Sequence, residues 1–286
     1  MRDLPNNPGE SAPRTTRAGV VRNRRSPWAA RGELAPASTM VLAVLGFLLP
    51  CLAWTFLSTS GWVDPVFLPT PLQVARSVGV WFEDGALTDD LVISMARVYG
   101  GFALSVAIAV PLGVLIGTLA PVRAFLEPVT DFSRYLPAVA FIPLIMLWVG
   151  IDESTKIAVI FVGTFCQMVL LIAADIARVP SAAVEAAKTM GATNGEVVKE
   201  VLIPAAWPAM LDTLRSMMGL SWTYLVVAEL VAASSGLGFS ILKAQRFLMT
   251  DQIFAGILLI GVAGLLTDQA FRWLHRRVFP WHHLRS

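Results

Sequence analysis

The sequence contains few charged residues. Asp, Glu, Lys and Arg make up only 15% of its 286 residues, whereas 56% are hydrophobic and the mean hydropathy is +0.66. Soluble domains usually carry about a quarter charged residues. The composition therefore excludes a soluble enzyme and a disordered chain, and it predicts an integral membrane protein. The net charge of +2 leaves no basic excess of the kind that nucleic-acid binding needs, so no nucleic-acid partner is expected.

Cysteine and histidine are also scarce. Two cysteines, Cys51 and Cys166, are too few for a disulfide framework or a zinc site. The three histidines, His275, His282 and His283, all lie near the C-terminal end, so we expect no metal site and no cofactor in this chain. The sequence has no Gly-x-Ser-x-Gly, no His-Glu-x-x-His and no phosphate-binding GxxxxGK[ST] stretch. A membrane-embedded enzyme is therefore a remote alternative, and the chain is not a nucleotide-binding subunit.

Long apolar runs are abundant. A bilayer core about 30 Å thick needs about 20 helical residues. Six runs approach or exceed that length, and six crossings place both termini on one side of the membrane. The sequence predicts an all-α membrane domain over residues 39–280 with spans at 39–58, 91–120, 135–150, 157–174, 217–233 and 253–271.

The basic residues predict the orientation of these spans. Residues 1–38 form a basic segment that we expect to be a disordered cytoplasmic tail, and residues 281–286 a short C-terminal tail on the same side. With these ends in the cytoplasm, 17 of the 22 Lys and Arg residues are cytoplasmic, as the positive-inside rule requires. The basic segment contains Arg2, Arg14, Arg17, Arg22, Arg24, Arg25 and Arg31.

The cytoplasmic segment 175–216, between the fourth and fifth runs, is too long for a simple connector. Pro180-Ser181 begins an alanine-rich helix that Gly191 ends. Thr193-Asn194 then provides an N-cap for a second short helix, which we expect Pro204 to end. Two short helices joined at a glycine corner form a compact surface that a partner can push without bending it.

The residues of this segment carry a resemblance to a known family. Their order and spacing are similar to the EAA loop of the membrane subunits of ATP-binding-cassette (ABC) importers, although valine and isoleucine stand where the family prefers isoleucine and leucine. The matching residues are Glu185, Ala186, Ala187, Gly191, Val201, Ile203 and Pro204.

Further motifs resemble one branch of that family, the permeases for nitrate, sulfonates, taurine, bicarbonate and pyrimidine precursors. The resemblance covers about residues 63–280. It is carried by Leu-Pro-Thr-Pro at 68–71, by Ser94-x-x-Arg97-Val98-x-x-Gly101-Phe102, by Ala228-Glu229-Leu230 and by Gly236-Leu237-Gly238.

The resemblance implies a fold, a function and partners. The fold is that of a type I (MetI-like) ABC importer permease with six transmembrane helices, in the bacterial inner membrane. Such a permease forms a homodimer, binds two ABC ATPase subunits that carry ATP and Mg, and receives solute from a periplasmic binding protein. The loop at 185–204 inserts into a groove of the ATPase. The expected solute is a small anion such as nitrate, a sulfonate or taurine.

Polar side chains within the apolar runs are candidates for the translocation pathway, because hydrocarbon makes them costly unless they face the bundle or water. Glu229 is the strongest single candidate, and we interpret it as a gate or a hydrogen-bonding anchor rather than an anion ligand. Interhelical hydrogen bonds are an equally open interpretation for Thr164, Gln167, Thr223 and Tyr224. The candidates are Arg97, Thr164, Gln167, Ser221, Thr223, Tyr224 and Glu229.

A transporter or channel that works without an ATPase is the main alternative. Such proteins show repeated halves or broken helices with paired acidic sites. No internal repeat is visible here, and Glu229 and Asp268 are the only acidic candidates within the runs.

Overall fold

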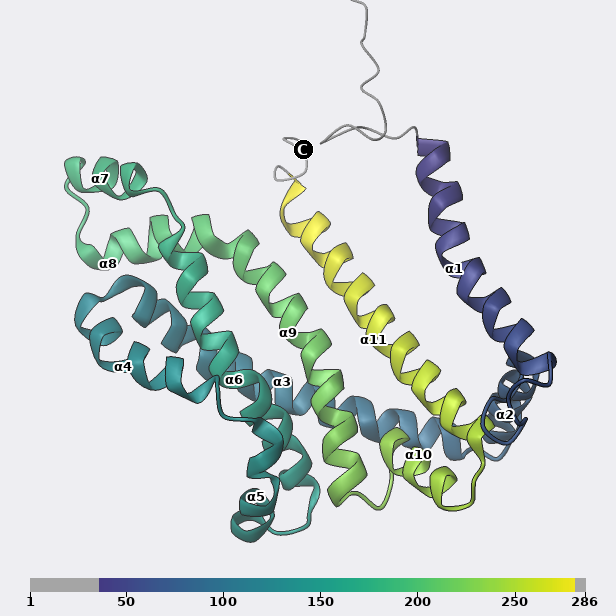
Figure 1. Cartoon of the computed structure of the whole chain (residues 1–286). Coiled ribbons are helices and arrows are strands. Elements are labelled where there is room, and N and C mark those ends of the chain that lie inside the picture. Colours follow the sequence, from purple (N-terminus) through teal and green to yellow (C-terminus); the bar gives the residue numbers. More distant parts are fainter. Residues whose placement is uncertain (1–35, 281–286) are drawn as a thin grey trace, which may run out of the picture. The chain divides into compact units, whose positions relative to one another are not determined.

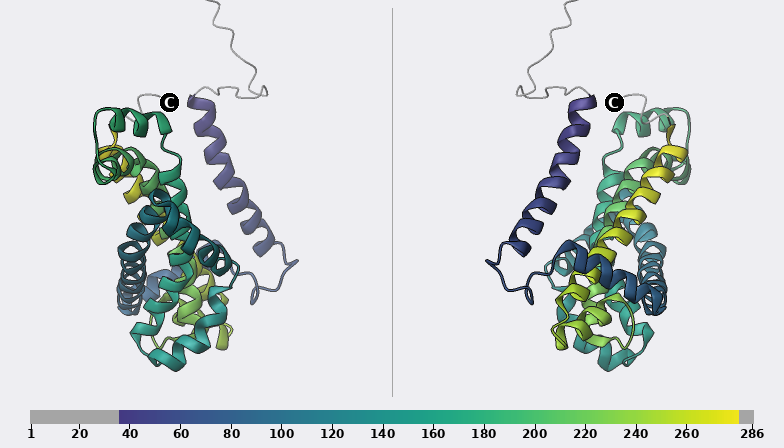
Figure 2. Two further views of the ribbon diagram at one scale, coloured as in Figure 1. Left: turned by 90° about the vertical axis from the view of Figure 1, so that its left-hand side faces the viewer. Right: turned by 90° about the vertical axis from the view of Figure 1, so that its right-hand side faces the viewer.

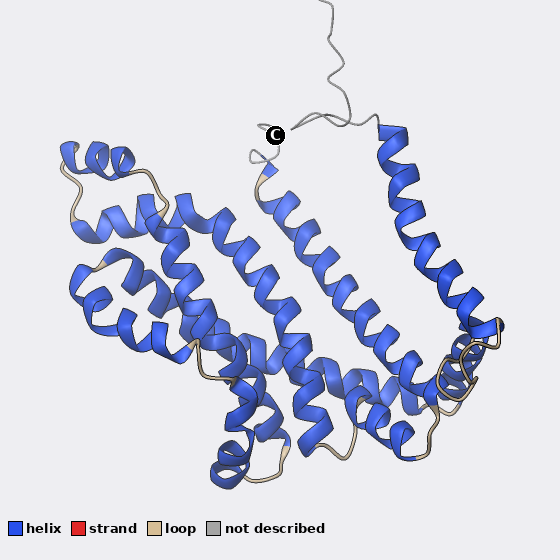
Figure 3. Cartoon of the chain, in the orientation of Figure 1, coloured by secondary structure: helices blue, strands red, loops and turns tan. Residues whose placement is uncertain are grey.

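In the computed structural model, residues 36–280 are described, and this range is built from helices without strands (Figures 1 and 3). Seven arginines of the predicted basic tail, together with His282 and His283, lie outside this range. The helices are α1 (Pro36–Thr59), α2 (Pro71–Glu83), α3 (Ala86–Thr118), α4 (Ala120–Ser133), the 3-10 helix η1 (Ala138–Phe141), α5 (Ile142–Val149), α6 (Glu153–Ala177), α7 (Ser181–Thr189), α8 (Asn194–Glu196), the π-helix η2 (Val197–Leu202), α9 (Ile203–Ala232), α10 (Leu237–Arg246) and α11 (Thr250–Val278).

The predicted spans fall on α1, α3, the α4–α5 pair, α6, α9 and α11. Among the described residues, α1, α3, α6 and α11 are each long and apolar enough to cross a membrane. The α4–α5 pair meets the same condition only as a broken span, bent by 87°. With 30 residues α9 is long enough, but it does not meet the same condition, because its sequence includes polar residues such as Arg215, Ser221, Thr223 and Glu229.

The third predicted span, 135–150, is not a straight helix. Residues Tyr135 to Pro137 are not helical, and α5 has only eight residues. Two prolines account for the break, because Pro137 precedes η1 and Pro143 lies in the first turn of α5, and neither can donate a backbone hydrogen bond. The predicted run therefore coincides with the second half of a broken span.

A run of small residues on α3 fixes how the core assembles. Gly101, Ser105, Gly113 and Gly117 face Ile160, Thr164, Ile172 and Ile176 of α6, each pair 59 residues apart in the sequence. A constant separation means that the two helices run parallel. A Cβ added at Gly101, Gly113 or Gly117 would lie 2.7 Å from the side chain of the facing isoleucine. Small residues of this kind let membrane helices approach closely.

Replacing Gly113 with alanine is expected to destabilise the protein by about 1–3 kcal/mol through overpacking. Gly100→Ala on the same helix is the control, because its Cβ would make an ordinary contact of 3.6 Å with Ile157. Helix propensity alone would favour alanine at both positions. The thermal midpoints of the two purified variants compare them, and equal midpoints would contradict the packing account.

Two ends of the bundle can be distinguished in residues 54–280. The α7 end carries α7 and α8, and the α10 end carries α5 and α10 (Figures 1 and 2). Towards the α7 end, Asp268 of α11 pairs with Arg215 of α9 at 2.5 Å and with Arg272 of its own helix at 2.6 Å. Asp268 therefore joins α9 to α11. The contacts divide the chain after Ala53, so the earlier part of α1 is described only as an apolar helix.

Candidate functional site

The segment between α6 and α9 has the predicted glycine corner. Helix α7 begins after Pro180 and ends at Thr189. Gly191 follows in the left-handed region with φ +89°. Its N–H donates to the carbonyl of Lys188 and the N–H of Ala192 to that of Ala187, at 2.9 and 3.1 Å. This pair of bonds is the Schellman arrangement that ends a helix, and it favours glycine at position 191.

The second helix of the segment begins as predicted. The Thr193 hydroxyl accepts from the N–H of Glu196, and the Glu196 carboxylate accepts from the N–H of Thr193, so the two residues form a capping box. These hydrogen bonds, the backbone one foremost, lower the pKa of the Glu196 carboxyl. They therefore stabilise this corner above the usual carboxyl pKa and are lost as the pH falls through the lowered value.

Pro204 does not end this second helix, so that prediction was wrong. The chain passes from α8 through the π-helix η2 directly into α9. Pro204 lies in the first turn of α9, where its missing N–H is least disruptive. The wider π turn just before it spares the chain the clash that a proline causes within a regular α-helix.

The motif residues divide into a packed side and an exposed side. Ala187 is 5% exposed and Val197 of η2 is 4% exposed, and α7 packs against η2. Val201 and Ile203 are partly buried, whereas Glu185, Ala186, Gly191 and Pro204 are exposed. The exposed members are therefore accessible to a partner at the α7 end.

The base of this segment is tied to the bundle. The Thr213 hydroxyl of α9 donates to the Asp175 carboxylate of α6 at 2.6 Å, and Asp175 is 4% exposed. Arg178 also pairs with Asp175, at 3.0 Å. The helices on either side of the segment are therefore held together where it leaves and re-enters the bundle.

At the α10 end, two motifs far apart in the sequence meet at one carboxylate. Glu229 of α9 is fully buried. Its Oε1 accepts from the Ser94 hydroxyl and from Arg97 Nη1, both at 2.7 Å, and its Oε2 accepts from the N–H of Gly238 at 2.7 Å. The Ser94-x-x-Arg97 motif of α3 and the Glu229…Gly238 motif therefore form one cluster.

Every N–H of the Arg97 guanidinium has an acceptor. Nη1 donates to Glu229 and to the Ser235 carbonyl, each at 2.7 Å. Nε donates to Glu153 Oε2 at 2.6 Å, and Nη2 donates to Glu153 Oε1 at 2.7 Å and to the Ser235 hydroxyl at 3.1 Å. Arg97 is 2% exposed. In this conformation it has no donor left for a passing solute.

The cluster also holds the start of α10. The N–H groups of Gly236, Leu237 and Gly238 donate to Asp90, Ser94 and Glu229, at 2.7, 2.9 and 2.7 Å. The first N–H groups of a helix have no partner within it, and carboxylates are favoured there by the helix dipole. Side chains of α3 and α9 therefore supply the cap that α10 lacks in its own sequence.

Glycine is required where α10 begins. Gly236 has φ +105°, and an added Cβ would lie 2.6 Å from Arg97 Nη1. A Cβ added at Gly238 would lie 2.8 Å from that of Glu229. The Gly-Leu-Gly motif is thus explained by the close approach of the chain to the buried charges.

Four charged side chains at the α10 end neutralise one another. Lys156 of α6 is 3% exposed, and its ammonium donates to Glu153 Oε1 at 2.9 Å. Arg97 and Lys156 therefore face Glu153 and Glu229, two positive charges against two negative. The Glu153 side chain differs from the other three because it is 59% exposed. We call Arg97, Glu153, Lys156 and Glu229 the charge cluster.

The remaining predicted pathway residues lie in different surroundings. Thr164 is buried and bonds to Ser105 of α3 at 2.7 Å, and the buried Ser221 hydroxyl donates to the carbonyl of Met217. Both therefore have structural hydrogen bonds. Gln167 and Thr223 are exposed, so Gln167 does not share the buried surroundings of Thr164.

Tyr224 packs against α6. It is partly buried, and a Cβ added at Gly163 would lie 2.6 Å from two of its ring atoms. The ring thus fills the space that the glycine leaves open between α6 and α9.

Several residues in and around the charge cluster were not predicted as site residues, although Ser94 was noted as part of a motif. They are Asp90, Ser94, Glu153, Lys156, Ser235 and Ser240, whose hydroxyl donates to Asp90 at 2.6 Å. A signal existed on α3, because Asp90, Ser94 and Arg97 follow one another at four and three residues and so share a helix face. Glu153 and Lys156 are spaced by three residues on α6 in the same way.

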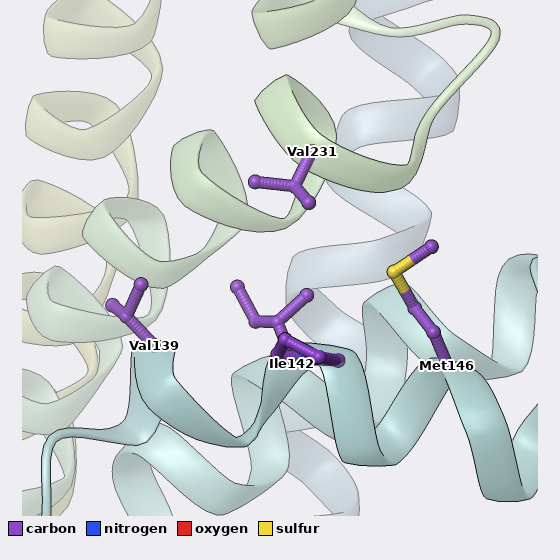
Figure 4. Close-up of a pocket in the computed structure, with 5 residues that line it drawn as sticks. Val139, Ile142, Met146 and Val231 are labelled. Atoms are coloured by element: carbon purple, nitrogen blue, oxygen red, sulfur yellow. The ribbon is translucent and has the colours of Figure 1, made fainter.

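An apolar pocket lies between α5 and the last turn of α9 (Figure 4). It is lined by Val139, Ile142, Pro143, Met146 and Val231. These side chains offer no hydrogen-bonding group to a small polar solute. Among the described residues, no group of three or more His, Cys, Asp or Glu is placed to hold a metal ion.

Comparison with known proteins decides the family. Residues 109–280 match the model of the binding-protein-dependent transport system inner membrane component. The chain belongs to this family. It is 33% identical to the taurine transport system permease protein TauC of Escherichia coli K12 over 267 residues, which cover 92% of this chain and 96% of that protein. It is 34% identical to the putative aliphatic sulfonates transport permease protein SsuC of Bacillus subtilis, over 82% of this chain and 87% of that protein.

A solved structure confirms the fold. The inward-facing MetNI methionine ABC transporter matches with a TM-score of 0.58 and 21% identity, over 73% of this chain and 98% of that one. The chain is therefore a non-enzymatic permease subunit with the type I importer fold, and ATP hydrolysis belongs to a separate subunit. Membership of this family rules out both alternatives, the stand-alone transporter and the membrane-embedded enzyme.

Proposed function

We propose that this permease imports a small solute that carries an oxyanion group, such as a sulfonate, taurine, nitrate or a similar acid. The observation that carries this proposal is the likeness over nearly the whole chain to permeases named for taurine and aliphatic sulfonates. The charge cluster at the α10 end supports it, because the buried cations Arg97 and Lys156 both contact the exposed Glu153 carboxylate, while Glu229 is buried behind them.

The proposed assembly is a homodimer of this chain with two ABC ATPase subunits, which carry ATP and Mg, and a periplasmic binding protein. Both termini and the α7 end face the cytoplasm, and the α10 end faces the periplasm. The exposed surface around Glu185, Ala186 and Gly191 then meets the ATPase. The tie between Asp175 and Thr213 supports this assignment, because it lets α6 and α9 receive a push on α7 together.

Within this assembly we assign the pathway to the exposed polar side chains of α6 and α9. Gln167 and Thr223 lie in apolar helices and yet are exposed, and contact with lipid would leave their polar groups unsatisfied. We therefore place them towards the solute path. Thr164, Ser221 and Tyr224 support the walls of that path, and Glu229 is an anchor at its periplasmic end.

Uptake tests the solute class. Cells that lack their own sulfonate importers would express this chain with its ATPase and binding protein. We expect saturable, ATP-dependent uptake of one labelled oxyanion from a panel of taurine, methanesulfonate, nitrate and bicarbonate. A neutral sugar and a cationic amino acid are the controls. Uptake of either control with none of the anions would contradict the proposed solute class.

A further inference from the structure

We propose that Arg97 and Lys156 form an oxyanion site, which the Glu153 carboxylate occupies in this conformation and which the anionic group of the solute takes over during passage. The proposal rests on the proposed function, since it assigns to the imported solute a specific place of contact. It concerns exchange of one bound anion for another, so no covalent bond changes.

The two cations are buried and belong to different helices. Arg97 of α3 is 2% exposed and Lys156 of α6 is 3% exposed. Within the described residues, the Lys156 ammonium hydrogen-bonds and pairs with Glu153. Without Glu153, the buried Lys156 ammonium would have no carboxylate partner, and two N–H groups of the Arg97 guanidinium would lose their acceptor. Such a pair of buried cations favours the binding of an anion.

The donors already have the geometry of an oxyanion site. Arg97 Nε, Arg97 Nη2 and Lys156 Nζ reach the two oxygens of one carboxylate at 2.6, 2.7 and 2.9 Å. The fork of a guanidinium matches the paired oxygens of carboxylates, sulfonates and related groups, and an ammonium adds a strong charged donor. Any group that replaces Glu153 must therefore present two or three anionic oxygens.

The two carboxylates of the cluster are not equivalent. Glu229 is fully buried and is also held by Ser94 and by the N–H of Gly238. Glu153 is 59% exposed, lies in the first turn of α6 and is held by the two cations. Rotation of its side chain into water is therefore the least costly way to open the cluster.

Because Glu153 is attached to the protein, we expect that dilute anions in solution do not take its place. A tethered group competes at a high effective concentration. A solute that is released into a closed cavity between two permease copies also has a high effective concentration. It can therefore compete with Glu153 for the two cations. The site would thus respond to a delivered solute and ignore background anions.

The test uses the full chain assembled with its ATPase subunits in lipid nanodiscs, without binding protein. The probe is sodium methanesulfonate at constant ionic strength, balanced with sodium chloride. The thermal midpoint is followed for the wild type, Glu153→Ala, Glu153→Ala with Lys156→Met, and Asp131→Ala. Asp131 is the matched control, because it pairs with Arg134 at 3.7 Å on the surface.

We expect Glu153→Ala to have a lower thermal midpoint that methanesulfonate restores, with an apparent affinity at least about tenfold tighter than in the wild type. Lys156→Met in the same background should remove this response, and Asp131→Ala should respond as the wild type does. Glu153→Gln should behave as Glu153→Ala, and it replaces that variant if the latter fails to assemble.

An equal response in the wild type and both Glu153 variants would overturn the proposal, as would a response that survives Lys156→Met. The experiment needs no transport, so such a result would leave the uptake prediction standing. Failure of uptake with a clear methanesulfonate response would support the oxyanion site itself but would count against the solute class and against use of the site by the imported solute.

Discussion

Replacing Glu229 with alanine is expected to lower the free energy of unfolding by about 3–5 kcal/mol and to abolish uptake. The substitution leaves the Arg97 guanidinium buried with half of its charge compensation removed. It also removes the carboxylate oxygens that accept hydrogen bonds from the N–H of Gly238 and from the Ser94 hydroxyl. The start of α10 is then no longer fixed to α3 and α9.

A double variant separates charge from packing. Arg97→Met with Glu229→Leu removes both ions, and an apolar pair of similar volume is often tolerated where one lone charge is not. We expect it to recover most of the stability lost in Glu229→Ala and little of the uptake, because the cap of α10 is still missing. Chemical denaturation and uptake assays check both expectations. A stable, active Glu229→Ala variant would contradict the structural role of the charge cluster.

Replacing Gly191 with tryptophan is expected to abolish uptake and co-purification of the ATPase, while the permease still inserts into the membrane. Gly191 is exposed at the proposed docking surface, and open space surrounds the position of its Cβ. The indole ring would therefore project from the loop towards the ATPase rather than into the permease. Pull-down of the ATPase and membrane fractionation measure the two effects separately.

Alanine variants isolate the backbone contribution. Gly191 has φ +89°, where an L-residue is strained by roughly 1–2 kcal/mol, whereas Gly195 lies in α8 without a positive φ. Both glycines are exposed with open space at the Cβ. Gly191→Ala should therefore weaken ATPase binding and Gly195→Ala should leave it unchanged. If both variants bind the ATPase as the wild type does, the glycine corner does not set the docking geometry.

The parts of the fold that depend on local sequence were predictable. Apolar runs located α1, α3, α6 and α11, because the bilayer sets the length of a span. Gly191 and Thr193 placed the corner of the segment between α6 and α9, because left-handed backbone and N-capping have strong residue preferences.

Prolines were harder to interpret from the sequence. A proline disrupts a regular helix, but the conformation that the neighbouring residues then adopt is not determined by the proline itself. Near Pro137 and Pro143 the chain bends into a broken span, whereas before Pro204 it widens into a π-helix and remains helical. The difference depends on packing around each site, which residue preferences do not contain.

The charge cluster could not be predicted in full because its members come from three helices. Arg97 and Glu229 are 132 residues apart, and each taken singly resembles a pathway residue. Only the structure shows that they neutralise one another and hold α10. The small-residue run of α3 includes Gly113 and Gly117, but the sequence does not show that α6 is their partner, since the periodicity of one helix does not identify its neighbour.

ATP hydrolysis by the assembled complex tests the central claim most directly. The chain would be co-expressed with its ATPase, placed in lipid and mixed with the binding protein, either empty or loaded with taurine, methanesulfonate, nitrate or bicarbonate in turn. We predict that one loaded form stimulates hydrolysis several-fold over the empty form, and that Gly191→Trp removes the stimulation. An ATPase that does not assemble with the chain, or hydrolysis that no loaded binding protein changes, would contradict the account.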